Sequence, residues 1–180
     1  AKTMTGPRVS LSHAGFHVND MDKMIDFYTN VFGLTVTDRG GDRLVFLCGD
    51  PKDHHQLIMI GGRDTEPGSK HYAHMAFRAD SMDTLREIHA KASNETDATD
   101  IRTMTHGNAW SVYFQDPEGN TAEAFFDTPW YVQQPFLEPY DLNQSDEDIF
   151  KYTEELLSKH DTTRPVEEWR QELSEKLGAN

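Results

Sequence analysis

The sequence has one cysteine, no long apolar run and few basic residues for its length. Cys48, the single cysteine among 180 residues, excludes an internal disulfide and indicates a reducing compartment, so we expect a cytoplasmic protein. No segment approaches the roughly 20 apolar residues of a membrane-spanning helix, and no signal-peptide pattern opens the chain. With 17 Lys and Arg against 31 Asp and Glu, the net charge of −14 argues against binding to nucleic acids or anionic membranes.

Histidines and aromatic residues are well represented by contrast. Hydrophobic residues make up 36% of the chain and aromatic residues 11%, which is enough for one folded core. The chain also carries nine histidines, an unusual number at this length. The length predicts one domain or two very small ones, and the histidines are the first place to look for function.

A weak internal repeat organises the first two thirds of the chain. His13 and Phe16 in the first copy recur as His74 and Phe77 at one constant offset. We therefore expect a domain over residues 1–127, built from modules at about 10–61 and 72–127, behind a loosely held arm at residues 1–9.

Each copy runs from a strand-like segment into an amphipathic helix. The apolar spacing predicts helices over residues 21–31 and 82–92, with Asp20 and Ser81 as N-caps and His89 on the buried face of the second. Strand-like runs follow at Leu44–Cys48, Leu57–Ile60, Val112–Phe114 and Ala122–Phe126. The predicted class is α+β: two paired βαβββ modules forming one curved, cup-like mixed sheet, with the helices outside.

Residues 128–180 change character and become acidic. Two helices are predicted there, one after a capping box at Ser145 and one starting near Pro165. Ile149, Tyr152, Leu156 and Leu157 supply the apolar stripe of the first, and Trp169, Leu173 and Leu177 that of the second. We expect a helical extension that packs on the sheet or on a second subunit and carries no chemistry.

Two histidines and a glutamate form the constellation that carries chemistry. Strand alternation turns His13, His74 and Glu123 toward the inside of the cup. Two neutral imidazoles and one carboxylate make a facial triad, which leaves three open positions on an octahedral metal and is associated with non-haem Fe(II) oxygenases. The competing interpretation is that these are hydrogen-bonded core or surface side chains with no metal.

Four short motifs in order resemble a known family. They are Ser12-His13-Ala14-Gly15, Asp53-His54-His55-Gln56-Leu57, His71-Tyr72-Ala73-His74-Met75-Ala76-Phe77, and Tyr113-Phe114-Gln115-Asp116-Pro117-Glu118-Gly119-Asn120 leading to Glu123. The chain resembles the vicinal oxygen chelate superfamily, whose members pair βαβββ modules around a metal, and is most similar to type I extradiol catechol dioxygenases. The resemblance covers residues 10–127; many relatives carry two such module pairs, whereas this chain has one.

The resemblance implies roles for particular residues. It makes His13, His74 and Glu123 the ligands of Fe(II), with Mn(II) as the alternative metal. It makes His55 the acid/base residue, with His54 as the less favoured neighbour. His106 and Tyr113 match residues that donate hydrogen bonds to the substrate, although the gap between them is shorter than the family spacing.

The implied reaction is cleavage of a catechol by dioxygen next to its hydroxyls, giving a muconic semialdehyde-type product. His54, Trp110, Phe125 and Trp130 are candidates for lining the substrate pocket, the last three also being candidates for plain core packing. A homodimer or higher homo-oligomer is expected, because a single module pair leaves sheet edges exposed.

Two other classes remain open. A glyoxalase-like isomerase or lyase of the same superfamily takes a fourth protein ligand from the last strand of the first module. Leu57 is predicted to occupy the position that mirrors Glu123, so this ligand is expected to be absent. A metal-free protein that binds a small molecule such as an antibiotic has no need of the three metal-binding side chains, so metal content separates the classes.

Overall fold

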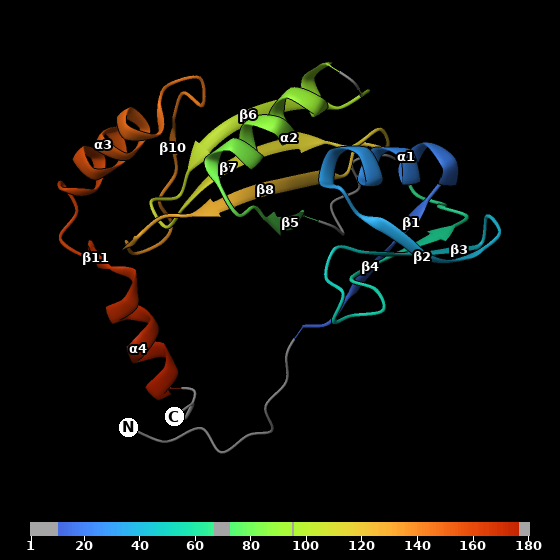
Figure 1. Cartoon of the computed structure of the whole chain (residues 1–180), viewed down its shortest axis with the longest axis horizontal. Coiled ribbons are helices and arrows are strands. Elements are labelled where there is room, and N and C mark those ends of the chain that lie inside the picture. Colours follow the sequence, from blue (N-terminus) through green and yellow to red (C-terminus); the bar gives the residue numbers. More distant parts are fainter. Residues whose placement is uncertain (1–10, 67–72, 95, 177–180) are drawn as a thin grey trace.

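The computed structural model describes residues 11–66, 73–94 and 96–176, and both modules follow the predicted order of one strand, one helix and three strands (Figure 1). The first module contains β1 (Ala14–Val18), α1 (Met21–Phe32), β2 (Thr35–Gly40), β3 (Leu44–Cys48) and β4 (Leu57–Gly61). The second contains β5 (Met75–Arg78), α2 (Met82–Asn94), β6 (Thr99–Thr105), β7 (Ala109–Gln115) and β8 (Thr121–Asp127). The predicted α+β class is confirmed.

The strands of the modules form two sheets, and a separate two-stranded sheet pairs β9 (Trp130–Tyr131) with β11 (Arg164–Pro165). The first has the order β1-β4-β3-β2, and the second has the order β10-β6-β7-β8-β5, where β10 is Glu138–Pro139. In each module the first strand pairs in parallel with the last, and the other neighbours pair antiparallel. The curved surface is thus divided between two sheets in the described part of the chain, where one continuous sheet was expected. Figure 1 shows α1 and α2 on the same side of the strands.

Helix α1 follows the prediction and extends one residue further, to Phe32. The side chain of Asp20 accepts a hydrogen bond from the backbone N–H of Lys23 at the first turn. Gly33 ends the helix with φ of 65°, a left-handed conformation that glycine adopts without strain. The apolar side chains of Met24, Phe27, Tyr28 and Val31 are buried on one face of the helix.

Helix α2 also follows the prediction, with one correction. The Ser81 hydroxyl accepts from the backbone N–H of Thr84, so Ser81 caps the helix as expected. Leu85 and Ile88 are buried in the core. His89, predicted as a core residue, is only half-buried, because the buried stripe of α2 runs through other positions.

The turn before β8 ties the second module to the first. The buried carboxylate of Glu118 accepts from the backbone N–H groups of Asn19 and Asp20, at 2.8 and 3.1 Å. Its Oε1 atom also lies 3.6 Å from Nη1 of Arg63, which is buried as well. Tyr28 of α1 donates from its hydroxyl to Asp116, whose pKa is raised by burial. These contacts fix α1 against the strand that carries Glu123.

The C-terminal extension packs on the edge of the second sheet. It contains β9 (Trp130–Tyr131), α3 (Asp146–Leu157), β11 (Arg164–Pro165) and α4 (Val166–Lys176). Ser145 caps α3 as predicted, and the indole of Trp110 donates to the Thr153 hydroxyl at 2.9 Å. Of the predicted apolar stripe Ile149 and Leu157 are buried, whereas Tyr152 is 37% exposed. Thr153 is buried in its place because it faces Trp110.

Leu177 and the arm at residues 1–9 lie outside the described residues. Within the described ranges, no helix combines the length and apolar character needed to cross a membrane.

Candidate metal centre and active site

A row of side chains crosses the face of the second sheet that points away from α2, which we call its cup face. The strand register places Ala76, Glu123, Tyr113 and Arg102 opposite one another on β5, β8, β7 and β6. His74 precedes β5, and its Nε2 atom lies 3.2 Å from Oε2 of Glu123. The other carboxylate oxygen of Glu123 accepts from the Ser111 hydroxyl at 2.7 Å. Glu123 is only 6% exposed, whereas the imidazole of His74 reaches solvent.

The spacing of this pair fits two ligands of one metal ion. Ligand atoms about 2.1 Å from an octahedral metal and adjacent to one another lie about 3.0 Å apart. The observed distance of 3.2 Å between the imidazole nitrogen and the carboxylate oxygen is close to that value. Ser111 holds the carboxylate in orientation, as outer hydrogen bonds do in metal sites.

Tyr113 and His106 form a hydrogen-bonded pair beside Glu123. Nδ1 of His106 lies 3.0 Å from the carbonyl oxygen of Phe136, and Nε2 lies 2.7 Å from the Tyr113 hydroxyl. A carbonyl only accepts, so Nδ1 carries the proton, and Nε2 of the neutral ring accepts from the phenol. Burial, and next the charge of Glu123, raise the pKa of Tyr113. Tyr113 is therefore a protonated phenol at the edge of the candidate metal site.

The histidines of the first module gather on the other sheet. The carboxylate of Asp38 lies 2.7 Å from Nε2 of His54, and Nδ1 of His54 lies 2.9 Å from Nδ1 of His55. Because Asp38 accepts, a neutral His54 accepts in turn from His55, which leaves the basic lone pair of His55 on Nε2. The ring centroids of His13 and His55 are 4.3 Å apart.

The environment of His55 keeps its imidazole neutral. Desolvation lowers the pKa of His55, and the neighbouring His13 and His54 lower it further. The ring also packs edge-on against Phe46, with centroids 5.0 Å apart. A neutral imidazole with one available lone pair has the properties of a proton acceptor.

The two groups of histidines remain separate. In the described part of the chain, no three His, Cys, Asp or Glu side chains stand close enough together to hold a metal ion. His74 and Glu123 are in contact, while His13 lies against His55. The role of His13 as the third metal ligand therefore remains a prediction.

The parallel register corrects one position in the first module. Gly15 pairs with Ile58 on β4, as the equivalent Ala76 pairs with Glu123 on β8. Ile58, and not Leu57, is therefore the residue that mirrors Glu123. Leu57 faces the core and is buried. An aliphatic side chain cannot bind a metal, so the first module offers no ligand at the mirrored position.

The predicted aromatic pocket is divided between two faces of the second sheet. Phe125 lies on the cup face, with the guanidinium of Arg78 4.9 Å from its ring centroid. Trp110 and Trp130 lie on the opposite face, where Trp130 contacts Phe150 of α3. Both tryptophans pack against α3 of the C-terminal extension, on the face of the sheet away from the histidines. A cavity of about 530 Å³ on that face borders Trp110 and Phe150.

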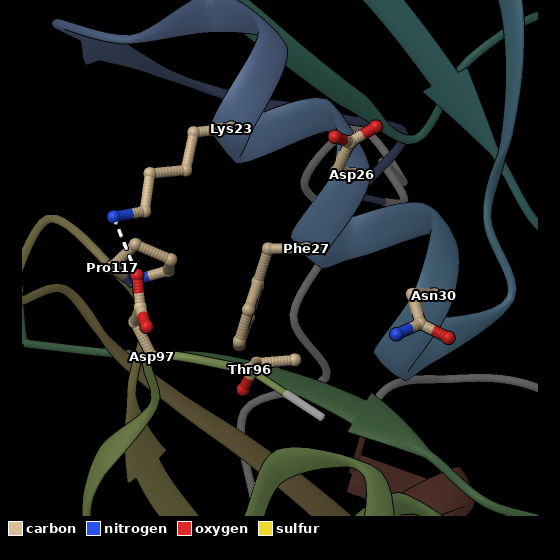
Figure 2. A pocket seen from close by; sticks show the side chains of 7 residues that line it. All are labelled: Lys23, Asp26, Phe27, Asn30, Thr96, Asp97 and Pro117. Atoms are coloured by element: carbon tan, nitrogen blue, oxygen red, sulfur yellow. Dashed lines mark ion pairs between the residues drawn. The ribbon is translucent and has the colours of Figure 1, made fainter. Parts of the chain in front are cut away.

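A second, smaller cavity of about 190 Å³ lies between α1 and the segment before β6. Figure 2 shows Lys23 reaching from α1 to Asp97, with Phe27 and Pro117 forming the walls. The Lys23 ammonium and the Asp97 carboxylate are 2.6 Å apart. None of the described residues that line this cavity is a histidine, so we assign it to the junction between the modules.

Sequence reasoning missed three polar residues around the centre. Ser111 shares a face with Tyr113 by simple alternation, a signal that was available. Asp38 and Arg102 gave no local signal, because their positions depend on a bulge in β2 and on an irregularity in β6.

Comparison with known proteins decides the family. A family model described as the Glyoxalase/Bleomycin resistance protein/Dioxygenase superfamily matches residues 10–124. The chain belongs to this superfamily. The match covers both modules and ends at β8, before the helical extension.

Two curated relatives are dioxygenases. The chain is 25% identical over 120 residues to biphenyl-2,3-diol 1,2-dioxygenase 2 of Rhodococcus globerulus, covering 64% of this chain and 62% of the relative. It is 28% identical over 127 residues to metapyrocatechase of Geobacillus stearothermophilus, covering 69% of this chain and 37% of the relative. The chain thus spans less than two thirds of the length of either relative.

Solved structures support the fold. A possible glyoxalase from Bacillus cereus superposes with a TM-score of 0.53 at 20% identity, covering 65% of this chain and 98% of that one. Lactoylglutathione lyase from Agrobacterium tumefaciens gives 0.51 at 23% identity, with coverages of 67% and 96%. A fosfomycin resistance protein from Listeria monocytogenes gives 0.52 at 20% identity, with coverages of 68% and 96%. These proteins share the paired-module fold.

Proposed function

We propose that the protein is an Fe(II)-dependent extradiol dioxygenase that opens the ring of a catechol with dioxygen. The observation that carries this proposal is the contact between His74 and Glu123 on the cup face, spaced like two metal ligands and oriented by Ser111. The dioxygenase relatives favour this chemistry over the other activities found in the superfamily. Ile58 at the mirrored position argues against an isomerase that needs a fourth protein ligand.

The metal would be held by His13, His74 and Glu123, and Mn(II) could replace Fe(II) with the same ligands. Bound iron would supply a template that holds catechol and dioxygen side by side and lets charge pass between them.

The chain's own residues supply proton chemistry and orientation. His55, neutral and with its lone pair on Nε2, takes a proton from the catechol and returns it later in the reaction. Tyr113 keeps its proton, and its hydroxyl donates to Nε2 of His106 in the free protein and turns to a substrate oxygen when the catechol binds. Phe125 offers an aromatic wall beside Glu123, and His54 orients His55.

Oxygen uptake after anaerobic Fe(II) loading tests the proposal. Catechol and 2,3-dihydroxybiphenyl are supplied in turn, and we expect one oxygen consumed per catechol together with a yellow product. Absence of uptake with every catechol, in protein that has retained iron, contradicts the proposed reaction. Failure to bind any divalent metal would favour a metal-free binding protein instead.

Two variants test the roles of the histidines. H74A is expected to lose retained iron, and stoichiometric iron in that variant contradicts the ligand assignment. H55Q is expected to retain iron but to react about 100- to 10,000-fold more slowly, the usual contribution of a general acid or base. H17Q, which changes an exposed histidine of β1, is the matched control and should keep both iron and rate.

A further inference from the structure

The cup face of the second sheet carries two arginines in a protein with a net charge of −14. Arg78 of β5 donates from Nε to the carboxylate of Asp127 at 2.7 Å. Its guanidinium also lies over the ring of Phe125. The charge of Arg78 is therefore already compensated by a close carboxylate.

Arg102 of β6 has a looser partner. Its Nε atom is 3.6 Å from the Asp100 carboxylate, beyond hydrogen-bond distance, and both side chains are more than half exposed. Such a pair contributes little to holding either side chain. The guanidinium lies over Tyr113, 5.8 Å from the ring centroid. Arg102 therefore has N–H donors to offer to an additional anion.

The strand register relates Arg102 to the candidate metal site. Arg102, Tyr113 and Glu123 face one another on three adjacent strands. Neighbouring strands are 4.7–4.9 Å apart, so the backbones of Arg102 and Glu123 are separated by about 10 Å. Because the guanidinium leans over Tyr113, it covers part of this gap. A benzene ring with a short acidic arm, lying over Tyr113, has the length needed to reach from Glu123 to this guanidinium.

We propose that Arg102 binds an anionic group on the aromatic substrate, so that the preferred catechol carries a carboxylate on a short side chain. The inference rests on the proposed function and names the substrate class of that site. The planar guanidinium matches the two oxygens of a carboxylate, which gives directional, charge-assisted hydrogen bonds. The diol end of the substrate lies toward Glu123 and His74, and the acid end lies toward Arg102.

Anaerobic calorimetry separates binding from turnover. Iron-loaded protein is titrated with 3,4-dihydroxyphenylacetate and with 4-ethylcatechol, which has a side chain of similar size and no charge. We expect the acid to bind about tenfold more tightly, as one charge-assisted hydrogen bond provides. The same titrations on metal-free protein report the contribution of the arginine without iron.

Variants at two positions sharpen the test. R102M should remove the preference for the acid and leave the affinity for 4-ethylcatechol unchanged. R102K should retain only part of the preference, because an ammonium group lacks the paired N–H donors of a guanidinium. D100N, which removes the competing carboxylate, should increase the preference. R170M makes the same charge change on α4, where Arg170 pairs with Glu167, and should have no effect.

Equal affinities for the two ligands in the unaltered protein, or a preference that survives R102M, would overturn the inference. Oxygen uptake distinguishes this from failure of the proposed function. If 4-ethylcatechol is consumed as readily as the acid and R102M changes neither rate, only the substrate assignment fails. If neither catechol consumes oxygen, the dioxygenase proposal fails, while binding of the acid that depends on Arg102 would still support the anion site.

Discussion

The two modules share one fold and differ in the residues that cross their cup faces. The register aligns two equivalent rows: Gly15, Ile58, Phe46 and Asp38 in the first sheet, and Ala76, Glu123, Tyr113 and Arg102 in the second. The first row is apolar except at its outer end. The second offers a carboxylate, a phenol and a guanidinium in succession.

This difference shows how the two halves of a duplicated scaffold can carry different chemistry at equivalent positions. Strand pairing fixes which positions face the cup, and the side chain at each position then decides what that half can bind. Glu123 contacts His74 where we propose the metal site, whereas the aliphatic Ile58 occupies the mirrored position in the first module. The first module supplies instead the histidine cluster of His13, His54 and His55.

Removing the carboxylate should have the largest effect on this comparison. E123A is expected to lose retained iron and all oxygen uptake, because a buried ligand is deleted from a three-residue set. I58A, the change at the mirrored position, should retain iron. Metal analysis of the two desalted variants after identical loading checks this, and iron loss in both or in neither would contradict the asymmetry.

Substitutions in the turns before β8 and β4 should differ in their cost to the free energy of unfolding by about 2.5 kcal/mol. In the second module Glu118 is buried against Arg63, and its deletion leaves that charge unpaired, so we expect E118A to cost about 3 kcal/mol. Lys52 occupies the equivalent position in the first module and is exposed, so K52A should change stability by less than about 0.5 kcal/mol. Urea unfolding of both variants gives the comparison, and equal costs would show that Glu118 is not a clamp.

The hydrogen bond from Ser111 to Glu123 should have a smaller effect on the metal. S111A leaves Oε1 of Glu123 without this donor, and loss of such an outer partner weakens metal affinity about 10- to 100-fold. S93A, on the exposed surface of α2, is the control. Competition with a chelator measures both affinities, and unchanged affinity in S111A would mean that the carboxylate is held by other contacts.

Titration of Tyr113 is the most subtle prediction. Its pKa is raised in the folded protein, so the folded state keeps this proton while an unfolded tyrosine loses it near pH 10. Any stability linked to this group is therefore present below about pH 10 and is lost as the pH rises further. Phenolate absorbance of folded, metal-free Y113F at about pH 11 should equal that of the unaltered protein. In urea, Y113F should lose the absorbance of one of the six tyrosines.

The sequence was sufficient for the helices, for some of the strands and for much of the facing of side chains, but no range was predicted for β2 or β6. Apolar spacing and the Asp20 cap gave α1, and the bounds of β3 were predicted as observed. Strand alternation correctly placed Glu123 and Phe125 on one face of β8, because the face on which a side chain lies depends only on its position along the strand.

Properties that depend on pairing between distant segments could not be predicted. Leu57 was chosen over Ile58 because the parallel register between β1 and β4 has no local signal. Glu118 accepts from Asn19 across 99 residues of sequence, and Trp110 is turned to α3 by Thr153. The division of the cup into two sheets likewise follows from long-range pairing.

The most direct test of the central claim is the position of iron in anaerobic crystals of the loaded protein, located by its anomalous scattering. The account predicts one iron site bound by His13, His74 and Glu123. Iron at the cluster of Asp38, His54 and His55, or away from Glu123 altogether, would contradict it.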